Sequence, residues 1–243
     1  MPIRFQFRLI PFVMTVLLVS LGIVLAQWQM RRADDKQIIK NTLLQRSAAA
    51  VIPFSSTLPS VEQLEYRHLS LRGEFIADWA VYLDNRPLNG VAGFYVLMPF
   101  KIVGAERAVL VVRGWLPRDP AIRDKLLPYI TPVGTIEIIG MVRRNFSRVL
   151  QLGDAGVLHP QAIIQNIDIK QFSEDSQLKL EPFILEQTSA LEDGLLRVWP
   201  SPALGIEKHR AYALQWYALA VMACIFFVIT GFRRGTKNKP ADE

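Results

Sequence analysis

Hydrophobic and polar positions divide the chain into three parts. Charged side chains are absent from Leu9–Trp28 and again from Tyr212–Phe232, and the stretch between them mixes polar and apolar residues. A helix needs about 20 apolar residues to cross a hydrocarbon core of about 30 Å, and both runs reach that length. The pattern therefore predicts one transmembrane helix near each end of the chain and a folded domain between them.

Aromatic and basic residues orient the second predicted helix. Tyr212, Trp216 and Tyr217 lie at its start, and such side chains prefer the headgroup level of a bilayer. Four basic residues follow its end between positions 233 and 239, and they favour a cytoplasmic C-terminus. With two spans, both termini are then cytoplasmic. We predict five segments: a cytoplasmic N-terminus (1–8), a transmembrane helix (9–28), an extracytoplasmic β-rich domain (29–208), a second transmembrane helix (209–232) and a cytoplasmic tail (233–243).

The first apolar run has a second interpretation, as a cleavable signal peptide. Val24-Leu25-Ala26 resembles a small-residue cleavage site. Against cleavage, the run is long for a signal core, and it continues into the helical pattern "QWQMRRADDKQIIKNTLLQR" without a glycine or proline. Basic residues follow this run as well, but a long domain is translocated despite such charges. We therefore expect the first helix to be retained.

Charge is distributed unevenly along the chain. The net charge is +6, yet residues 27–208 hold 21 basic and 20 acidic side chains, so the excess lies in the flanks. Positive charge beside a membrane attracts anionic lipid. A nucleic-acid interface needs a basic patch on the folded domain, so we expect the lipid bilayer as a partner and no nucleic acid. The single cysteine, Cys224, lies within the second span and excludes an intramolecular disulfide.

The central domain has the pattern of a β protein. Short runs rich in β-branched and aromatic residues alternate with turn signals such as "DNRPLNG" and "TPVG". Two stretches, 118–127 and 168–178, have a helical pattern, and Asp168 is a candidate N-cap. We expect a mostly antiparallel barrel or sandwich, and hence an α+β membrane protein. The expected strands lie within residues 66–75, 80–85, 94–102, 107–115, 134–142, 162–169 and 182–188.

Motifs of common enzymes are missing from the sequence. It has no glycine-rich nucleotide loop, no G-x-S-x-G nucleophile elbow, no H-E-x-x-H and no C-x-x-C. His68 and His159 stand in a strand pattern and in a loop without companion residues. We therefore expect a protein that is not an enzyme, with a membrane-anchored hydrolase as a distant alternative.

Polar and aromatic side chains gather where the two predicted helices meet the outer interface. His209, Tyr212 and Trp216 share one helical face with Gln215 beside them, and Trp28, Arg31 and Arg32 end the first span. One interpretation is an aromatic belt with snorkelling arginines. Another is a site for a large amphipathic ligand with an axial imidazole and guanidinium partners for carboxylates, a description that haem fits.

Four segments resemble the Surfeit locus protein 1 family of cytochrome c oxidase assembly factors. They occur in the family's order and frame both spans: "LAQWQMRRADDK", "RPLNGVAGFYVLMPF", "AVLVVRGWLP" and "RVWPSPALGIEKHRAYALQWYALA". Two departures lie in the central domain. Val112 replaces a common asparagine, and "AIIQNIDI" lacks the tryptophan usual before its aspartate. The segments next to the membrane keep the family pattern.

The resemblance implies a non-enzymatic function in oxidase biogenesis. It implies that haem a is bound transiently at the outer interface and delivered to the large subunit of a haem-copper cytochrome c oxidase. His209 matches the proposed haem contact and is the expected ligand of the iron, and Arg113 and Trp115 are expected to fill the core or to contact a partner protein. The remaining expected haem neighbours are Trp28, Arg31, Arg32, Tyr212, Gln215 and Trp216.

Partners and location complete the expectation. The large oxidase subunit and the haem a synthesis machinery are the expected protein partners. The alternative is a scaffold without a cofactor that stabilises a nascent oxidase subunit. The chain starts almost directly at the first span, without an Arg- and Ser-rich presequence, which favours a bacterial inner membrane with a periplasmic main domain.

Overall fold

The chain forms two compact units. The computed structural model describes residues 3–5, 7–55, 58–122, 125–145, 158–200 and 204–234. One unit comprises Met1–Thr42 and Pro202–Glu243, and the other comprises Leu43–Ser201. We call the first the helical unit and the second the β domain, and each is described by itself.

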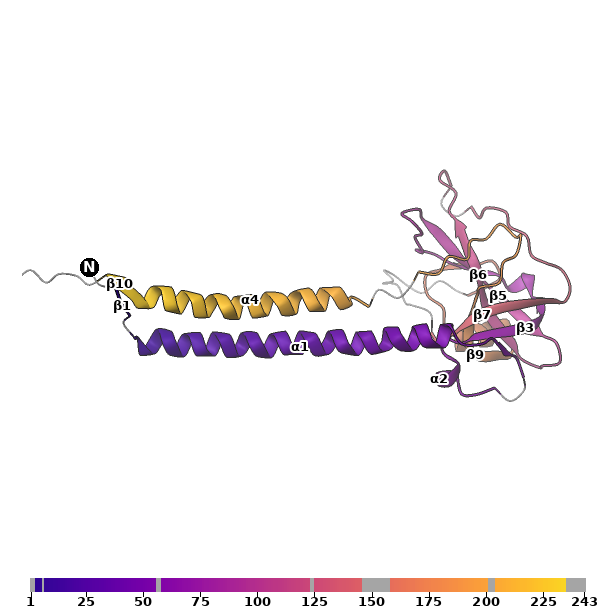
Figure 1. The fold of residues 1–243 in the computed structure, drawn as a ribbon. Coiled ribbons are helices and arrows are strands. Elements are labelled where there is room, and N and C mark those ends of the chain that lie inside the picture. Colours follow the sequence, from indigo (N-terminus) through magenta and orange to yellow (C-terminus); the bar gives the residue numbers. More distant parts are fainter. Residues whose placement is uncertain are drawn as a thin grey trace, which may run out of the picture. The chain divides into compact units, whose positions relative to one another are not determined.

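The helical unit is built from two long helices that lie side by side (Figure 1). α1 covers Leu9–Ser47, its last residues belonging to the β domain, and α4 covers Ile206–Gly231. Both are long and apolar enough to cross a membrane. A two-stranded antiparallel ribbon of β1 (Ile3–Phe5) and β10 (Phe232–Arg234) joins the start of α1 to the end of α4. α1 continues through the polar stretch after the first apolar run, as predicted, because no glycine or proline interrupts it before Pro53.

Small residues form the seam between α1 and α4. On α1 the buried positions are Gly22, Ala26 and Ala33, and on α4 they include Ala213 and Ala220. A Cβ added at Gly22 would lie 3.1 Å from the Ala220 Cβ and 3.1 Å from the backbone carbonyl oxygen of Trp216. Small side chains allow helix backbones to approach closely, as in helix pairs within membranes. The two helices therefore pack along a narrow seam that bulky residues would widen.

The β domain is organised around one eight-stranded sheet. The strand order is β2-β3-β7-β9-β6-β5-β4-β8, and an additional β3–β5 pairing closes strands β3, β7, β9, β6 and β5 into a barrel. Among the described residues of this domain, three short helical segments accompany the sheet: α2 (Val61–Leu64), the 3-10 helix η1 (Ala77–Trp79) and α3 (Ile169–Ser176). The strands are β2 (Ile52–Pro53), β3 (His68–Phe75), β4 (Val81–Leu83), β5 (Gly93–Ile102), β6 (Ala108–Pro117), β7 (Ile136–Arg143), β8 (Ile163–Ile164) and β9 (Leu180–Gln187).

The seven predicted strand regions all contain strands, but the expected mostly antiparallel sheet is corrected to a mixed one. β6 pairs with β9 in parallel, as do β2 with β3 and β4 with β8. Parallel neighbours need a crossover connection. Between β6 and β9 the chain supplies one that contains β7, β8 and α3. Strand propensity identifies the strands but not the direction in which distant strands pair.

The central strands are buried on both faces. One core lies inside the barrel and includes Val96, Met98 and Val111, whereas a second core on the opposite face includes Leu97 and Leu110. α3 covers part of the second core through its residue Phe172, which is fully buried. Burial on both faces explains why β5 and β6 have nearly continuous apolar sequences instead of the alternating pattern of a half-exposed strand.

One predicted helix is wrong and one is confirmed. Within the described parts of residues 118–127 no helix forms, because the Asp119 carboxylate accepts hydrogen bonds from the backbone N–H groups of Ala121 and Ile122 and holds a turn. The helix expected over 168–178 is α3, and Asp168 caps it by accepting from the Lys170 and Gln171 N–H groups. The sequence of residues 145–161 also predicts a surface loop, and most of this stretch lies outside the described residues.

Candidate functional site

A polar pair interrupts the apolar seam of the helical unit. His209 Nδ1 on α4 lies 2.7 Å from Gln29 Oε1 on α1. Neighbouring seam positions are apolar and almost completely buried, with Ala33 at 0% and Ala213 at 1% exposure. An amide and an imidazole at hydrogen-bond distance satisfy each other where the surroundings offer little water. The pair is therefore a polar site built between two helices.

Helical periodicity brings this pair together. On α1, Gly22 and Gln29 are seven residues apart, as are Ala26 and Ala33, so all four positions lie on the seam face. The contacts of Gly22 with Ala220 and of Gln29 with His209 show that the helices run antiparallel, because residue numbers rise on one helix as they fall on the other. Close packing at Gly22 thus supports the contact two turns away.

The predicted aromatic and basic residues flank the polar pair. Trp216 lies two turns from His209 and is partly buried. Arg32 follows Gln29 by three residues, and Tyr212 follows His209 by three, so each is rotated by about 60° from the seam. In an antiparallel pair these equal rotations carry both side chains to the same side of the helix pair. Arg32 and Tyr212 are exposed there.

Three further predicted residues are distributed over the two sides. Trp28 and Gln215 are exposed, and their helical positions lie on the side of Arg32 and Tyr212. Arg31 is also exposed, but it is about 200° of helical rotation from Gln29 and faces away from the seam. The arrangement therefore gathers six of the seven residues predicted for the haem site and leaves Arg31 apart. The role of each of the seven in haem binding stays a prediction.

Sequence reasoning missed Gln29 as the partner of His209. At the end of the first span the sequence also offers two polar pairs four residues apart, Gln27 with Arg31 and Trp28 with Arg32. The signal was present in the i, i+4 spacing of Gly22 and Ala26, because small residues at that spacing mark a helix contact, and Gln29 lies seven residues after Gly22 on the same face. Which side of α1 faces α4 is decided only by the packing.

The chemistry of this site fits a haem group. A neutral imidazole whose Nδ1 faces an amide oxygen has its other ring nitrogen available for iron. Exposed aromatic side chains at Trp28 and Tyr212 provide flat apolar surface for a macrocycle, and the Arg32 guanidinium suits a propionate carboxylate. Iron ligand, apolar surface and cation are thus all present within one helical unit.

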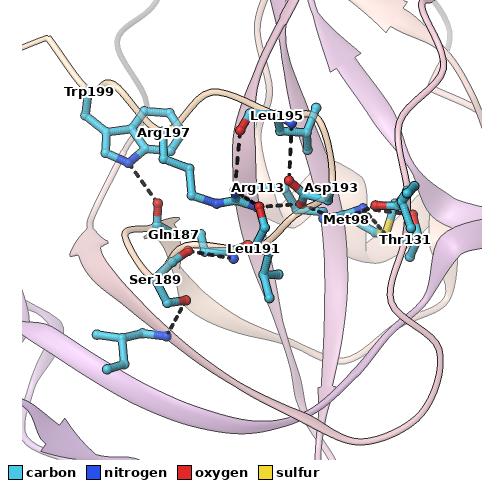
Figure 2. Close-up of polar contacts among 12 residues, drawn as sticks. Met98, Arg113, Thr131, Gln187, Ser189, Leu191, Asp193, Leu195, Arg197 and Trp199 are labelled. Carbon is cyan, nitrogen blue, oxygen red and sulfur yellow. Dashed lines mark hydrogen bonds and ion pairs between the residues drawn. The ribbon is translucent and has the colours of Figure 1, made fainter.

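A second polar cluster lies inside the β domain, around Arg113 (Figure 2). The Arg113 side chain has 0% exposure and donates to Asp193 Oδ2 at 2.8 Å, to the Ile130 carbonyl at 2.9 Å and to Thr131 Oγ1 at 2.8 Å. Its guanidinium also lies over the Phe75 ring, 4.5 Å from the centroid. Burial lowers the pKa of Arg113, and the Asp193 charge opposes that shift. The cluster stabilises a charge that would otherwise be costly inside a protein.

Asp193 links this arginine to the segment that follows β9. Arg197 Nη2 donates to Asp193 Oδ2 at 2.5 Å, and the Leu195 N–H donates to Asp193 Oδ1 at 3.2 Å. The indole N–H of Trp199 donates to the Gln187 carbonyl at 2.8 Å. The R-G-W and R-x-W-P segments, which are distant in the sequence, are therefore joined by one carboxylate (Figure 2).

Gly114 and Trp115 are packed beneath the same segment. Trp115 exchanges backbone hydrogen bonds with Leu196, and a Cβ added at Gly114 would lie 2.7 Å from the Leu195 Cβ. The glycine lies within β6 and therefore serves the close approach of this segment. Trp115 is 4% exposed, as a core residue would be. Partner contact by Arg113 and Trp115 stays a prediction, and it would require the covering segment to move.

Comparison with known proteins extends over most of the chain. Residues 15–221 match the SURF1 family, a range that includes both Gln29 and His209. The chain belongs to the SURF1 family. Among SURF1-like proteins, that of Rickettsia felis is 27% identical over 235 residues, covering 91% of this chain and 95% of the relative. That of Rickettsia prowazekii is 26% identical over 226 residues, covering 88% and 85%. The cytochrome oxidase assembly protein SHY1 of Saccharomyces cerevisiae is 28% identical over 102 residues, covering 41% of this chain and 26% of the relative. The family expected from four short segments is thus confirmed.

Proposed function

We propose that this SURF1 family member is a membrane-anchored assembly factor for cytochrome c oxidase. It holds haem a transiently in the helical unit and helps to insert it into the large oxidase subunit. Family membership and the name of the yeast relative, a cytochrome oxidase assembly protein, support the assembly role. The protein acts by binding and transfer and carries out no bond chemistry of its own. The haem a synthesis machinery is the expected source of the cofactor.

The proposed location is the inner membrane of a bacterium. α1 and α4 are the membrane spans, both termini are cytoplasmic, and the β domain is periplasmic. Two long apolar helices and the similarity to Rickettsia proteins support this location. The positive residues that follow α4 support the cytoplasmic position of the C-terminus.

The contact between His209 and Gln29 is the observation that carries the haem proposal. It holds an imidazole at a helix seam with one ring nitrogen engaged and the other available to iron. Haem a, when bound, supplies the iron and a large apolar ring. Trp28, Tyr212 and Trp216 would contact that ring, and Arg32 would pair with a propionate. These residues bind and orient the group during its stay.

The haem proposal is tested on protein purified in detergent from cells that make haem a. We expect the wild type to carry haem a in its absorption spectrum, and His209→Ala and His209→Tyr to lose or visibly shift that absorption while the protein still inserts. His209→Met should retain partial binding, because a thioether still ligates iron. Wild-type protein that contains no haem but co-purifies with an oxidase subunit would favour the scaffold without a cofactor.

Two arginine variants serve as matched probes of the propionate contact. Arg32→Ala should weaken haem retention modestly, because a charge contact near water is worth about 0–1 kcal/mol. Arg31→Ala should weaken it less, because position 31 faces away from the seam. A larger loss in Arg31→Ala than in Arg32→Ala would place the ligand on the other side of the helix pair.

A further inference from the structure

Gln29 constrains which nitrogen of the neutral His209 ring carries the proton. The atom that faces Nδ1 at 2.7 Å is the amide oxygen Oε1. An amide oxygen only accepts hydrogen bonds, whereas each nitrogen of a neutral imidazole either donates or accepts. With Oε1 in this place, Nδ1 carries the proton and donates a hydrogen bond to Gln29. The lone pair of the neutral ring is then on Nε2.

The surroundings of the pair strengthen this constraint. Ala26 and Ala33 on α1 and Ile206 and Ala213 on α4 are at most 7% exposed, so apolar groups lie at the neighbouring seam positions on both sides. Hydrogen bonds are stronger where the local dielectric constant is low. Within the part of the chain that the structure describes, the His209 ring has no second side-chain hydrogen bond. Gln29 is thus the group that orients the imidazole.

We propose that Gln29 is a positioning residue that selects the Nδ1–H tautomer of His209 and keeps Nε2 available as an iron ligand. The tautomer is inferred from the contact between Gln29 and His209 alone. The role of Nε2 as an iron ligand rests on the proposed haem function. Residues that hold the second nitrogen of a metal-binding histidine fix its orientation and tune its donor strength. Most such partners are carboxylates, carbonyls or water. A neutral side-chain amide makes the imidazole a weaker donor than a carboxylate does, which suits a protein that must release its haem.

The first experiment examines the tautomer in the protein without haem. Nitrogen NMR of the full chain in detergent, with labelled histidine and at a pH where the ring is neutral, should show Nδ1 as the protonated nitrogen of His209. Gln29→Leu should shift the ring toward the Nε2–H tautomer, whereas Gln27→Leu, at an exposed position of the same helix, should leave it unchanged. A wild-type ring protonated on Nε2 would overturn the proposal.

The second experiment uses protein loaded with haem a. We expect Gln29→Leu to weaken haem retention by about 10- to 100-fold, as is usual when the partner of a ligating histidine is lost. Gln29→Glu should restore retention and lower the midpoint potential of the iron, because a carboxylate makes the imidazole a stronger donor. Gln27→Leu should match the wild type in retention and in potential.

The two experiments separate the possible failures. If the wild type binds no haem, the proposed function fails, while the nitrogen spectra still decide whether Gln29 sets the tautomer. If haem binds and Gln29→Leu changes neither retention nor tautomer, the positioning role is overturned and the haem function stands. If Gln29→Leu does not fold, Gln29→Glu with an unchanged potential would contradict the proposal in its place.

Discussion

Asp193 lies between two guanidiniums inside the β domain. Arg113 and Arg197 both donate to its Oδ2 atom, and the side chains of Asp193 and Arg113 are at most 1% exposed (Figure 2). The carboxylate also fixes a backbone N–H of the segment that it belongs to. At the scale of single residues, the buried positive charge of Arg113 is therefore stabilised by one carboxylate, that of Asp193.

Replacing Asp193 with alanine should destabilise the β domain strongly. The change leaves two guanidiniums without their carboxylate, and such a loss costs about 3–5 kcal/mol of unfolding free energy. The midpoint of thermal or denaturant unfolding of the full chain in detergent measures the effect. Asp175→Ala, at an exposed position of α3, is the matched control and should cost little. Equal midpoints for the two variants would contradict the charge argument.

Glu186 gives the β domain a pH dependence. Burial raises the pKa of its carboxyl from the usual 4.5, and the charge of Arg143 opposes this only in part. A carboxyl whose folded pKa is raised binds its proton more tightly in the folded state. Its contribution to stability is therefore fully present below pH 4.5 and is lost as the pH rises through the folded pKa.

Glu186→Gln should remove this dependence. As the pH rises from 4.5 to 7.5, the unfolding temperature of the wild type should fall relative to that of Glu186→Gln. Glu174→Gln, at an exposed position of α3, serves as the control and should give the same difference at both pH values. A difference for Glu186→Gln that moves the other way would mean that Arg143 outweighs burial.

The seam of α1 and α4 sets the spacing of the two helices. Its small residues allow closer contact than the 8–10 Å typical of helix axes, and a Cβ added at Gly22 would lie only 3.1 Å from the Ala220 Cβ. At the scale of elements, the site near His209 thus depends on residues that carry no chemistry themselves. A change of volume at Gly22 is expected to alter both helix spacing and the distance between Gln29 and His209.

Gly22→Leu should push the helices apart. Electron spin resonance on labels at the exposed positions Leu18 and Met222, in a Cys224→Ser background, should show a mean distance longer by about 1–2 Å and a broader distribution. Ser20→Leu places the same side chain at an exposed position of α1 and should leave the distance unchanged. Identical distances in both variants would remove Gly22 from the packing contact.

At the scale of the whole molecule, two apolar helices enclose one sheet-rich domain in the sequence. In the sequence, the β domain connects the end of α1 to the start of α4. If both helices span the bilayer, these two ends therefore face the same side of it. The described ribbon of β1 and β10 joins the start of α1 to the end of α4 and requires those two ends to lie together. This pairing supports a hairpin arrangement of the two helices.

A topology experiment tests this arrangement. A reporter fused after Glu243 should be cytoplasmic, and one inserted at the turn next to Val133, which is 98% exposed, should be periplasmic. Reporters on the same side would contradict the two-span hairpin. The mass of the mature chain is the control. Cleavage after Ala26 would lower that mass and would remove the first span together with its seam residue Gly22.

Local sequence determined much of this protein. Apolar runs of sufficient length determined both long helices, β-rich runs determined the seven strand regions, and Asp168 determined where α3 begins. These features depend on neighbours within a few residues, which a single sequence displays. Four short segments were also enough to identify the family. The helix expected over 118–127 failed because the Asp119 side chain bonds to the backbone and competes with a helix.

Tertiary structure alone decided the contacts between distant segments. The parallel pairing of β6 with β9, the meeting of Arg113 with Asp193 and the contact of Gln29 with His209 join residues that are about 70 to 180 positions apart. Periodicity limits which residues share a face, but it does not say which face meets which partner. That choice follows from the total packing and charge balance of the folded chain, in which Gly22 admits Ala220 and Asp193 neutralises a buried arginine.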